Sequence, residues 1–439
     1  MHIHFIGIGG IGVSALAKYH IEKGDTVSGS DLSYSEIVKE LEDLGARIII
    51  GKHVKKSVPK ETKKVIHTAA IKTSNPELHI ARERGMVTET YAQAVGKITK
   101  RYHTITVSGS HGKSTTTALS ALVLNEGYCD PTVIVGTKIK EFKNSNFRSG
   151  KSKYLVLEAD EWNKSFLHYS PHIAVVTNID AEHLDTYKTM EGVEKTFTEF
   201  LSKVPKNGVI IANADDPPLR RVAGPFGKKV RWYSKHNNGD ADLVRRVLRV
   251  PGEHNVSNAL AALTLGRVLG IADRNILKAF SRFSGCWRRF EFKGIVNGAS
   301  VFSDYGHHPT EIKATIRAAR DRFPLRRVWC VYQPHQFQRL HYLWQDFTEA
   351  FDMADRVCVL PVYDVAGREV RGVKHTANSL ILAKEIAKRG KNISYVANFK
   401  KADKLLREET RSGDVILIMG AGDIYTFADD LTSGVDRSK

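Results

Sequence analysis

Residues 108–115 read SGSHGKST, and this stretch decides how the chain is expected to fold. It follows an apolar, β-branched segment at 104–107 and opens a helical pattern at 116–124. A strand, a glycine-rich turn and a helix N-terminus form a phosphate cradle, because backbone N–H groups and the helix dipole point toward the anion. Lys113 adds a cation and the Ser114 hydroxyl can ligate Mg²⁺, so the stretch predicts a nucleoside triphosphate site.

The motif departs from the full phosphate-loop pattern, because Val107 stands where that pattern has its first glycine. An ordinary glycine turn that caps a helix is the alternative interpretation. The GKST run directly behind a strand favours nucleotide binding over that alternative. The ATP-binding residues expected in the loop are Gly109, Ser110, His111, Gly112, Lys113, Ser114 and Thr115.

A second glycine-rich turn lies near the start of the chain, where residues 7–12 read GIGGIG. A predicted strand at 3–8 leads into it and a predicted helix at 13–23 follows. Such a turn suits a dinucleotide pyrophosphate, and Asp31, about 20 residues on, could reach a ribose hydroxyl or remain a simple loop carboxylate. An oxidoreductase has no need of an additional ATP-type turn. The two turns together indicate an enzyme that holds a nucleotide-linked substrate and consumes ATP.

Composition limits the class of protein. The 439 residues suggest about three domains, and no stretch approaches the roughly 20 apolar residues of a membrane span. The first residues run into a strand without a signal peptide, so we expect a cytoplasmic protein with no membrane insertion. The charge of +18 is spread along the chain without a nucleic-acid module, which favours polyanionic small molecules over nucleic acid. Free thiols are expected at Cys129, Cys286, Cys330 and Cys358.

Strand and helix patterns alternate along the chain, which predicts parallel sheets covered by helices. Polar connections at 99–103 and 284–287 divide the pattern into three expected domains: 1–99, 100–288 and 289–439. We expect a Rossmann-like first domain, a central P-loop ATPase domain with a mostly parallel sheet, and a doubly wound Rossmann-like third domain. The clearest predicted strands are 154–157, 173–177, 209–212, 300–303, 328–332, 356–360, 393–396 and 415–419.

Polar side chains follow two of the predicted strands in the central domain. Glu158 comes directly after 154–157, and His183 follows 173–177 closely. Carboxylates near a phosphate loop make a Mg²⁺ site, which metal-dependent ATP chemistry requires. Asp180 and Glu182 are equally compatible with solvated acids.

The order of the motifs resembles the Mur ligases over nearly the whole chain. Within that family the likeness is greatest to the branch that joins L-alanine to UDP-N-acetylmuramate in peptidoglycan synthesis. Eight motifs in one order are hard to obtain by chance. They occupy residues 7–12, 108–117, 158–161, 177–185, 254–262, 288–290, 304–311 and 420–424.

The resemblance implies a reaction and its participants. ATP would phosphorylate the lactyl carboxylate of UDP-N-acetylmuramate, and the amine of L-alanine would then attack the acyl phosphate and release phosphate. Mg²⁺ would be the metal cofactor, and the enzyme would be a monomer or a homodimer. Two alternatives remain: a recycling ligase that attaches a whole peptide, and a regulator that binds nucleotide without turnover. Intact Lys113, Ser114, Glu158 and His183 argue against the regulator.

The resemblance also implies roles for individual residues. The catalytic residues would be Lys113, His183 and Arg289. Ser114 and Glu158 would hold a first metal ion and His183 a second. Outside the loop, ATP would be bound by His254, Asn255, Asn258, Arg289 and Asp304. The substrates would be bound by Gly9, Gly10, Ile11, Gly12, Asp31, Asn178, Tyr305, His307, His335 and Arg339.

Three departures from the family pattern bear on function. Gln336 and Phe337 replace an arginine and a tyrosine of the amino-acid pocket, which predicts weaker or altered amino-acid binding unless Arg368 or Arg371 compensates. Residues 234–250 are fewer than usual and are expected to form a trimmed surface hairpin. Thr198 stands where many members have a carbamylated lysine, a feature that the alanine-adding branch lacks.

Overall fold

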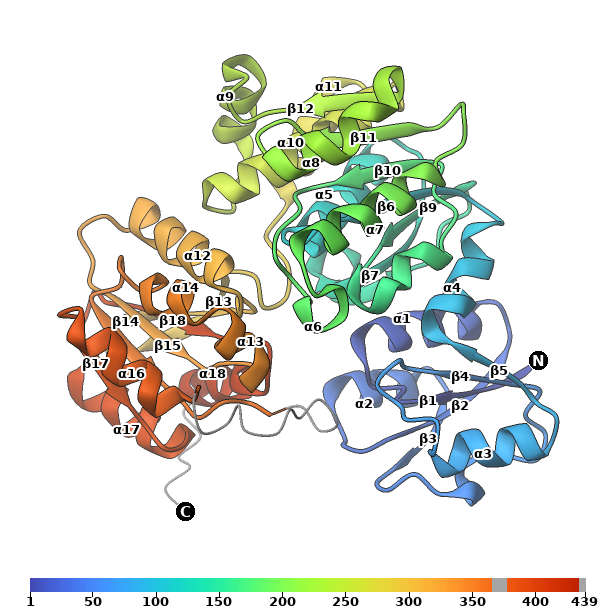
Figure 1. Cartoon of the computed structure of the whole chain (residues 1–439), viewed down its shortest axis with the longest axis horizontal. Coiled ribbons are helices and arrows are strands. Elements are labelled where there is room, and N and C mark those ends of the chain that lie inside the picture. The colour runs from blue at the N-terminus through green and yellow to red at the C-terminus, as the bar shows by residue number, and fades with distance from the viewer. Residues whose placement is uncertain (365–376, 434–439) are drawn as a thin grey trace. The chain divides into compact units, whose positions relative to one another are not determined.

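The computed structural model describes residues 1–364 and 377–433. Within these residues the chain forms three α/β domains, each built on a sheet with helices against it (Figure 1). Contacts divide the chain into two compact units, residues 1–249 with 256–284 and residues 250–255 with 285–439. The first unit contains the first two sheets and the second unit contains the third. None of the helices in the described residues has the length and apolar composition needed to cross a membrane.

The first sheet is parallel and has the order β3-β2-β1-β4-β5 among the described strands. The order reverses beside β1, where doubly wound sheets bind their ligands, and the glycine turn follows β1 there. The strands are β1 (His2–Ile6), β2 (Thr26–Asp31), β3 (Arg47–Ile50), β4 (Lys64–His67) and β5 (Val87–Thr90). The helices are α1 (Ile11–Glu22), α2 (Glu36–Asp43), η1 (Lys55–Ser57), α3 (Pro76–Glu83) and α4 (Tyr91–Thr99).

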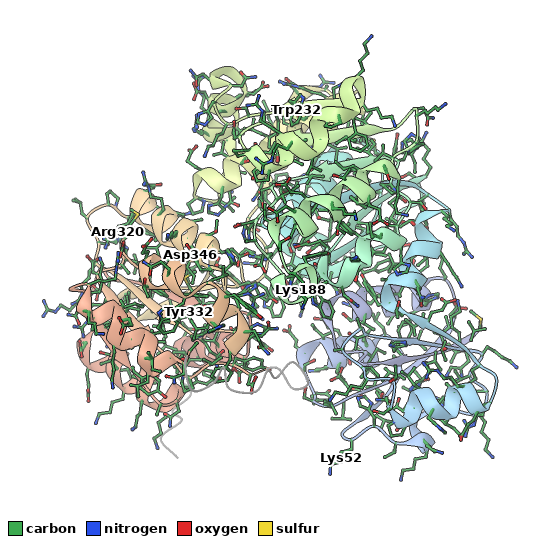
Figure 2. The ribbon with its side chains drawn as sticks, in the orientation of Figure 1. Lys52, Lys188, Trp232, Arg320, Tyr332 and Asp346 are labelled. Atoms are coloured by element: carbon green, nitrogen blue, oxygen red, sulfur yellow. The ribbon has the colours of Figure 1, made fainter. Side chains whose placement is uncertain are left out.

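The second sheet has the order β12-β11-β10-β6-β9-β7-β8, and β7–β8 is its antiparallel pair among the described strands. The central strand β6 lies between β9 and β10, so the segments after these three strands share one edge. The strands are β6 (His103–Ser108), β7 (Thr132–Ile139), β8 (Ser145–Arg148), β9 (Tyr154–Glu158), β10 (Ile173–Val176), β11 (Val209–Asn213) and β12 (Val230–Tyr233). Trp232, on the edge strand β12, is 41% exposed (Figure 2).

Helices and short 3-10 segments connect the strands of this second sheet. Helix α5 follows the phosphate loop and is buried at every residue from Ser114 to Leu124, as expected for a helix that is packed on all sides. The segments are α5 (Lys113–Glu126), η2 (Lys140–Phe142), η3 (Trp162–His168), α6 (Leu184–Tyr187), α7 (Met190–Ser202), α8 (Pro217–Ala223), η4 (Gly224–Lys229), α9 (Asn238–Val247), α10 (Glu253–Val268) and α11 (Asp273–Arg282).

The third sheet has the order β13-β14-β18-β15-β16-β17, with β13–β14 antiparallel among the described strands. Its middle strands β15 and β18 are buried at every residue, because helices cover both faces. The strands are β13 (Glu291–Val296), β14 (Ala299–Asp304), β15 (Val328–Tyr332), β16 (Arg356–Val359), β17 (Ile393–Tyr395) and β18 (Val415–Met419). The helices are α12 (Pro309–Arg322), α13 (Phe337–Tyr342), α14 (Trp344–Glu349), α16 (Ser379–Lys388), α17 (Phe399–Glu409) and α18 (Ile424–Ser433).

The expected hairpin at 234–250 is wrong, because this stretch contains the helix α9. Ala241 and Val244 are three residues apart and both buried, which is helical spacing. Asp240 lies in the first turn and Arg245 in the last, so the charges at both ends favour the helix dipole.

Polar contacts join the glycine turn to the central domain within the first unit. Asn146 of β8 donates from Nδ2 to the Ile11 carbonyl at 2.6 Å and accepts at Oδ1 from Lys18 Nζ at 2.9 Å. The nearby Lys138 of β7 is 1% exposed and forms ion pairs with Glu36 and Glu40 at 3.1 and 2.5 Å. Strand β8 therefore holds the start of α1, where the glycine turn ends, and β7 holds α2.

A buried hydrogen-bond network lies beneath the same turn. Glu77 and His4 are both fully buried, and Glu77 Oε2 is 3.0 Å from His4 Nε2. The same carboxylate accepts from the Ser30 hydroxyl at 2.7 Å and lies 2.9 Å from His53 Nδ1. The Ser30 carbonyl in turn accepts the N–H groups of residues 7 and 8, so the network supports the turn directly. Burial would raise the pKa of Glu77, but these hydrogen bonds lower it overall.

Replacing Glu77 by alanine is expected to destabilise the first unit by about 3 kcal/mol or more, because buried histidines and a hydroxyl lose their partner. Since the folded pKa is lowered, the carboxylate stabilises the fold above its unfolded pKa of about 4.3, and this contribution is lost as the pH falls through the folded value. Thermal unfolding at pH 7 and pH 3 measures both effects. The control Glu83→Gln, on the exposed end of α3, should change little. Equal loss for both variants would contradict the role of the network.

Candidate active site

The phosphate loop joins β6 to α5 and depends on glycine at two positions. Gly109 has a φ of +128°, and a Cβ there would lie 2.1 Å from Thr177 Oγ1. Gly112 has a φ of +81°, and its Cβ would lie 2.3 Å from Asn258 Oδ1. Any other residue would be strained in backbone and would collide with these neighbours. The loop therefore needs both glycines for the tight path that exposes its N–H groups.

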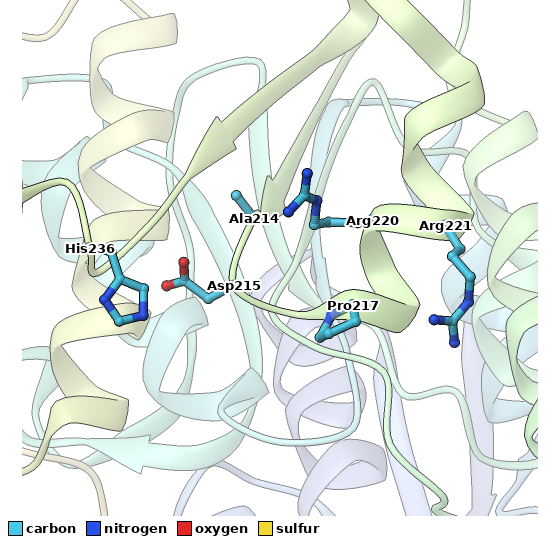
Figure 3. A pocket seen from close by; sticks show the side chains of 6 residues that line it. All are labelled: Ala214, Asp215, Pro217, Arg220, Arg221 and His236. Atoms are coloured by element: carbon cyan, nitrogen blue, oxygen red, sulfur yellow. The ribbon is translucent and has the colours of Figure 1, made fainter.

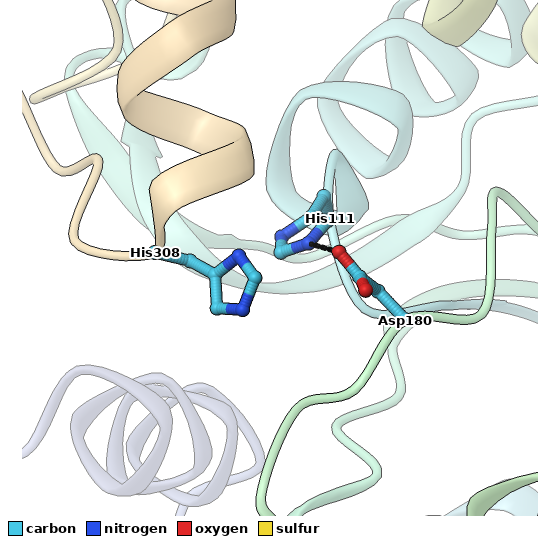
Figure 4. Close-up of side chains that lie close together, drawn as sticks. All are labelled: His111, Asp180 and His308. Carbon is cyan, nitrogen blue, oxygen red and sulfur yellow. Dashed lines mark hydrogen bonds and ion pairs between the residues drawn. The ribbon is translucent and has the colours of Figure 1, made fainter. Parts of the chain in front are cut away.

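Residues 177–180, which follow β10, hold the loop from the side. Thr177 Oγ1 donates to the His111 carbonyl at 2.6 Å. Asn178 accepts from the His111 N–H at 2.9 Å and donates to the His111 carbonyl at 3.1 Å. His111 Nε2 lies 2.8 Å from Asp180 Oδ2, as the dashed line in Figure 4 marks. Asn178, which is expected to bind substrate, and Asp180, for which the sequence leaves a functional role and a solvated acid equally open, both hold the loop.

Lys113 turns back over the loop and forms a buried ion pair. Its Nζ donates to the carbonyls of Gly109 and Ser110 at 2.7 and 3.1 Å, and to Glu161 Oε2 at 2.8 Å. Burial alone would lower the pKa of Lys113, but neighbouring carboxylates, Glu161 first, raise it above the ordinary value. Burial raises the pKa of Glu161, against the attraction of Lys113. The lysine is thus charged and lies at the start of α5.

Ser114 and Glu158 meet beside this ion pair. Ser114 Oγ donates to Glu158 Oε1 at 2.9 Å, and the Gly136 N–H donates to Oε2 at 2.7 Å. Burial raises the pKa of Glu158, which shows that the ionised carboxylate is poorly solvated there. A hydroxyl and a carboxylate at a phosphate loop are oxygen ligands of the kind that Mg²⁺ prefers. The donor set fits the predicted first metal ion.

His183 lies with two carboxylates rather than with Ser114. Its Nε2 is 3.7 Å from Glu161 Oε1, and Asp160, Glu161 and His183 place ligand atoms within 4.8 Å of one another. His183 has a φ of +54°, a conformation that residues with a side chain seldom adopt. The predicted second metal ligand thus has a nitrogen and two carboxylates close by. Sequence reasoning did not assign Asp160 or Glu161, although both directly follow β9.

The first glycine turn is closed by Asp31. Its Oδ2 accepts the Gly9 N–H at 2.8 Å, and its Oδ1 accepts the Leu32 N–H at 2.7 Å. The turn ends at α1, whose N-cap is Gly10, so Gly9 to Gly12 lead directly into a helix N-terminus. This is an arrangement that binds anions. Asp31 shapes the turn, and a contact with ribose stays a prediction.

The expected adenine residues lie on the first turns of α10. The side chain of His254 is exposed on the first turn of this helix. Asn255 donates from Nδ2 to the Pro251 carbonyl at 2.6 Å. Asn258 lies against Gly112 of the phosphate loop. The helix thus brings Asn258 to the loop within the first unit, while His254 and Asn255 belong to the second.

The linker into the third domain carries Arg289 and is tied to Asp304. Arg289 lies 5.0 Å above the Tyr305 ring and 3.5 Å from Glu311 Oε1. Asp304 accepts the Phe290 N–H at 2.8 Å and the Gly306 N–H at 2.7 Å, so both of its oxygens hold backbone. Burial raises the pKa of Asp304, although Arg289 opposes this.

Histidines and an arginine converge in the third domain. His307 lies 5.9 Å from His335, measured between ring centroids. Arg339 Nη1 is 3.3 Å from both Nδ1 and the carbonyl oxygen of His335. Tyr363, which sequence reasoning missed, stacks on His335 at 5.6 Å with an interplanar angle of 9°. The structure therefore brings together the residues expected to hold the amino acid, and adds an aromatic ring.

Gln336, the departure from the family pattern, is buried at the N-cap of α13. It is 9% exposed and has a φ of +71°, and its N–H donates to the Tyr363 carbonyl at 3.0 Å. Arg368 and Arg371, the alternative cations, lie outside the described residues. Thr198 is exposed on α7, where its hydroxyl donates to the Glu194 carbonyl at 2.9 Å.

A surface pocket of about 520 Å³ lies apart from these residues, at the end of β11 (Figure 3). Asp215, Arg220, Arg221 and His236 are among the side chains that line it. The Asp215 carboxylate is already used by the Ser234 hydroxyl at 2.5 Å and the Lys235 N–H at 2.8 Å. No residue predicted for the site lines this pocket.

A phosphate loop with a buried lysine–carboxylate pair, on the carboxyl edge of a mostly parallel sheet, defines an α/β nucleotide-binding enzyme. Three family models match consecutive parts of the chain. They are the Mur ligase family catalytic domain at 2–103, the Mur ligase middle domain at 107–266, and the Mur ligase glutamate ligase domain at 288–422. The chain belongs to the Mur ligase family.

Relatives and solved structures agree with this assignment. The chain is 39% identical to the UDP-N-acetylmuramate–L-alanine ligase of Desulfosudis oleivorans, over 99% of both chains. It is 38% identical to the ligase of the same name from Acetivibrio thermocellus, over 97% of this chain and 94% of that one. The crystal structure of UDP-N-acetylmuramate-alanine ligase from Thermotoga maritima matches with a TM-score of 0.81, at 26% identity and full coverage of both chains. A murein peptide ligase from Psychrobacter arcticus shares the fold, with a TM-score of 0.71 at 22% identity, 99% of this chain and 98% of that one.

Proposed function

We propose that the protein joins L-alanine to the lactyl carboxylate of UDP-N-acetylmuramate, with ATP converted to ADP and phosphate, in peptidoglycan synthesis. One observation carries this proposal. In the phosphate loop, Lys113 pairs with Glu161 beside Ser114 and Glu158. The same chain has a glycine turn after its first strand. The names of the relatives support the same reaction. The enzyme acts in the cytoplasm as a monomer or homodimer, with domains at 1–99, 100–288 and 289–439.

A carboxylate is a poor electrophile, so the first step converts it to an acyl phosphate. The carboxylate oxygen attacks the γ-phosphorus of ATP, and the bond from that phosphorus to the bridging oxygen of ADP breaks. Phosphoryl transfer depends mainly on positioning and on stabilising charge. Loop N–H groups and the Lys113 ammonium supply this stabilisation, and Lys113 moves from Glu161 onto the γ-phosphate.

In the second step the amine of L-alanine attacks the acyl carbon. The tetrahedral intermediate collapses, phosphate leaves with the former carboxylate oxygen, and the amine loses a proton. Arg339 and the histidines His307 and His335 hold the carboxylate of the amino acid, because a guanidinium and imidazole N–H groups donate to it. His254, Asn255 and Asn258 hold adenine.

Two groups of residues would hold Mg²⁺. Ser114 and Glu158 would ligate one ion, and His183 with Asp160 or Glu161 would ligate another. The metal would offset negative charge on the phosphate oxygens. The Gly136 N–H holds Oε2 of Glu158 in place.

Release of ADP tests the proposal when UDP-N-acetylmuramate is offered with L-alanine, glycine, L-serine or a tripeptide. We expect L-alanine to give the highest kcat/KM and a product that contains both substrates. Highest activity with the tripeptide would instead identify a recycling ligase. ATP and UDP-sugar binding without turnover for any amine would indicate a regulator.

The first glycine turn is expected to bind UDP-N-acetylmuramate and no nicotinamide cofactor. Gly9 lies against Asp31, and Ile11 is held by Asn146 of the central domain, so the turn is held in place, and the names of the relatives favour the sugar nucleotide as its ligand. Calorimetry should give binding of the UDP-sugar in the micromolar range and no heat with NAD. Binding of NAD with none of the UDP-sugar would overturn this assignment.

Replacing Gln336 by arginine is expected to lower the KM for L-alanine about tenfold and leave the KM for ATP unchanged. A charge-assisted hydrogen bond to the carboxylate exceeds a neutral one by about 1–2 kcal/mol. The paired variant Gln338→Arg, two residues along on α13, is the control for added charge. An unaltered KM for alanine would show that another cation already serves this carboxylate.

A further inference from the structure

Arg288 is a buried cation to which the roles above give no task. The residue is 6% exposed, and three aromatic rings surround its guanidinium. The guanidinium carbon lies 4.5 Å from the ring centre of Tyr425, 4.7 Å from that of Tyr305 and 5.5 Å from that of Trp287. Aromatic faces stabilise a cation in this way. The charge is therefore held in one place and orientation.

The guanidinium binds the loop at 420–423, which follows β18. Arg288 Nη2 donates to the Gly420 carbonyl at 2.7 Å and to the Gly422 carbonyl at 3.0 Å. Arg288 itself has a φ of +57° and Phe290 a φ of +48°. Such conformations are costly for residues with side chains and persist only where the surroundings impose them. Arg288 therefore holds the linker at 288–290 against the loop at 420–423.

The other side of the loop contacts the expected amino-acid residues. Gly422 lies so close to Tyr363 that a Cβ would be 2.5 Å from the Tyr363 Cγ. Gln333 Nε2 donates to Asp423 Oδ1 at 3.0 Å. Since Tyr363 stacks on His335, the loop lies between Arg288 and the ring pair that includes an expected alanine ligand. A shift of the loop would move that pair.

We propose that Arg288 is a positioning residue for the amino-acid half of the reaction. By holding the carbonyls of Gly420 and Gly422 it sets the loop against Tyr363, and so fixes the orientation of His335. The next residue, Arg289, is expected to contact ATP, so one linker serves both halves of the reaction. This inference rests on the proposed function, because it concerns the KM for the amino acid.

Arg288→Lys tests the proposal. Lysine keeps the charge but lacks the planar guanidinium, whose N–H groups donate to two carbonyls while its faces stack on the aromatic rings. We expect the KM for L-alanine to rise about ten- to a hundredfold, as expected for a small misplacement of substrate-binding groups. The KM for UDP-N-acetylmuramate should stay the same. Gly422→Ala, which pushes on Tyr363 directly, should raise the same KM.

Two variants serve as controls. Arg327→Lys changes an arginine that also stacks on a ring, Trp329, and donates to a carbonyl, that of Glu409, at the opposite end of β15. Gly224→Ala changes a glycine whose Cβ would meet open space. Both should leave the KM for alanine unchanged.

The outcomes separate this inference from the proposed function. If the wild type makes no product from UDP-N-acetylmuramate and alanine, both fail. If the wild type is active and Arg288→Lys loses only thermal stability, with its KM for alanine unchanged, the positioning role alone is overturned. If Arg288→Lys does not fold, Gly422→Ala decides: a wild-type KM for alanine contradicts the proposal.

Discussion

Lys113→Ala is expected to abolish ligation, with kcat lowered by at least about a hundredfold. The ammonium is the charge closest to the transferred phosphoryl group, and removing one such donor costs about 3 kcal/mol or more. In the structure this ammonium donates to two carbonyls of the loop and to Glu161, and it leaves Glu161 to reach the phosphoryl group. Steady-state ADP release at saturating substrates measures the effect, and Lys203→Ala on the exposed end of α7 is the control.

The loss could instead come from Glu161, which would be left buried without its partner. The double variant Lys113→Ala/Glu161→Gln removes that carboxylate charge, and Glu161→Gln alone measures how much activity the carboxylate itself contributes. We expect it to regain thermal stability but no activity. Recovery of turnover would show that the lysine serves only to neutralise Glu161, and would contradict its role in phosphoryl transfer.

Glu158→Gln is expected to raise the Mg²⁺ concentration for half-maximal activity and to lower kcat, each by about tenfold or more. Groups that merely orient metal ligands are worth about 10- to 100-fold, and Glu158 is an expected ligand itself. Glutamine keeps the shape but not the charge, and only one of its two terminal atoms can accept from Ser114 or Gly136. Titration of activity with Mg²⁺ at fixed ATP gives both quantities.

Glu126→Gln provides the matched control at the far end of α5. Glu126 forms ion pairs with Lys278 and Arg282 at 2.8 and 2.6 Å, so its replacement also removes a paired carboxylate. It should leave the Mg²⁺ requirement unchanged. If Glu158→Gln responds to Mg²⁺ as the wild type does, Glu158 is no metal ligand and only orders the sheet edge.

Strands with a continuous apolar run were predictable to the residue. Both 328–332 and 415–419 match β15 and β18, because helices bury both faces and the sequence is apolar throughout. The short strands β3 and β5 were not predicted, because β5 has a single apolar residue and β3 is only four residues long with none of them buried. The helix α9 was missed because its apolar positions are few and its polar residues read as a turn.

The site divides in the same way between local and distant contacts. The glycines, Lys113 and Ser114 share one loop, so their spacing in the sequence sets their geometry. The pairing of Glu161 with Lys113 was missed because the two residues lie 48 apart in the sequence, and the pairing of β6 with β9 brings their segments together. Tyr363 was missed because its stacking on His335 joins two separate strand ends. Asp31 and Asn178 accept backbone N–H groups of the two turns, and their contact with substrate stays a prediction.

An isotope experiment tests the acyl-phosphate reaction most directly. UDP-N-acetylmuramate labelled with ¹⁸O in both oxygens of the lactyl carboxylate is incubated with ATP, Mg²⁺ and L-alanine, and the released phosphate is analysed by mass spectrometry. We expect one ¹⁸O atom in each phosphate formed and one in the amide product. Unlabelled phosphate accompanied by product would contradict the account, because the carboxylate oxygen would never have been bonded to phosphorus.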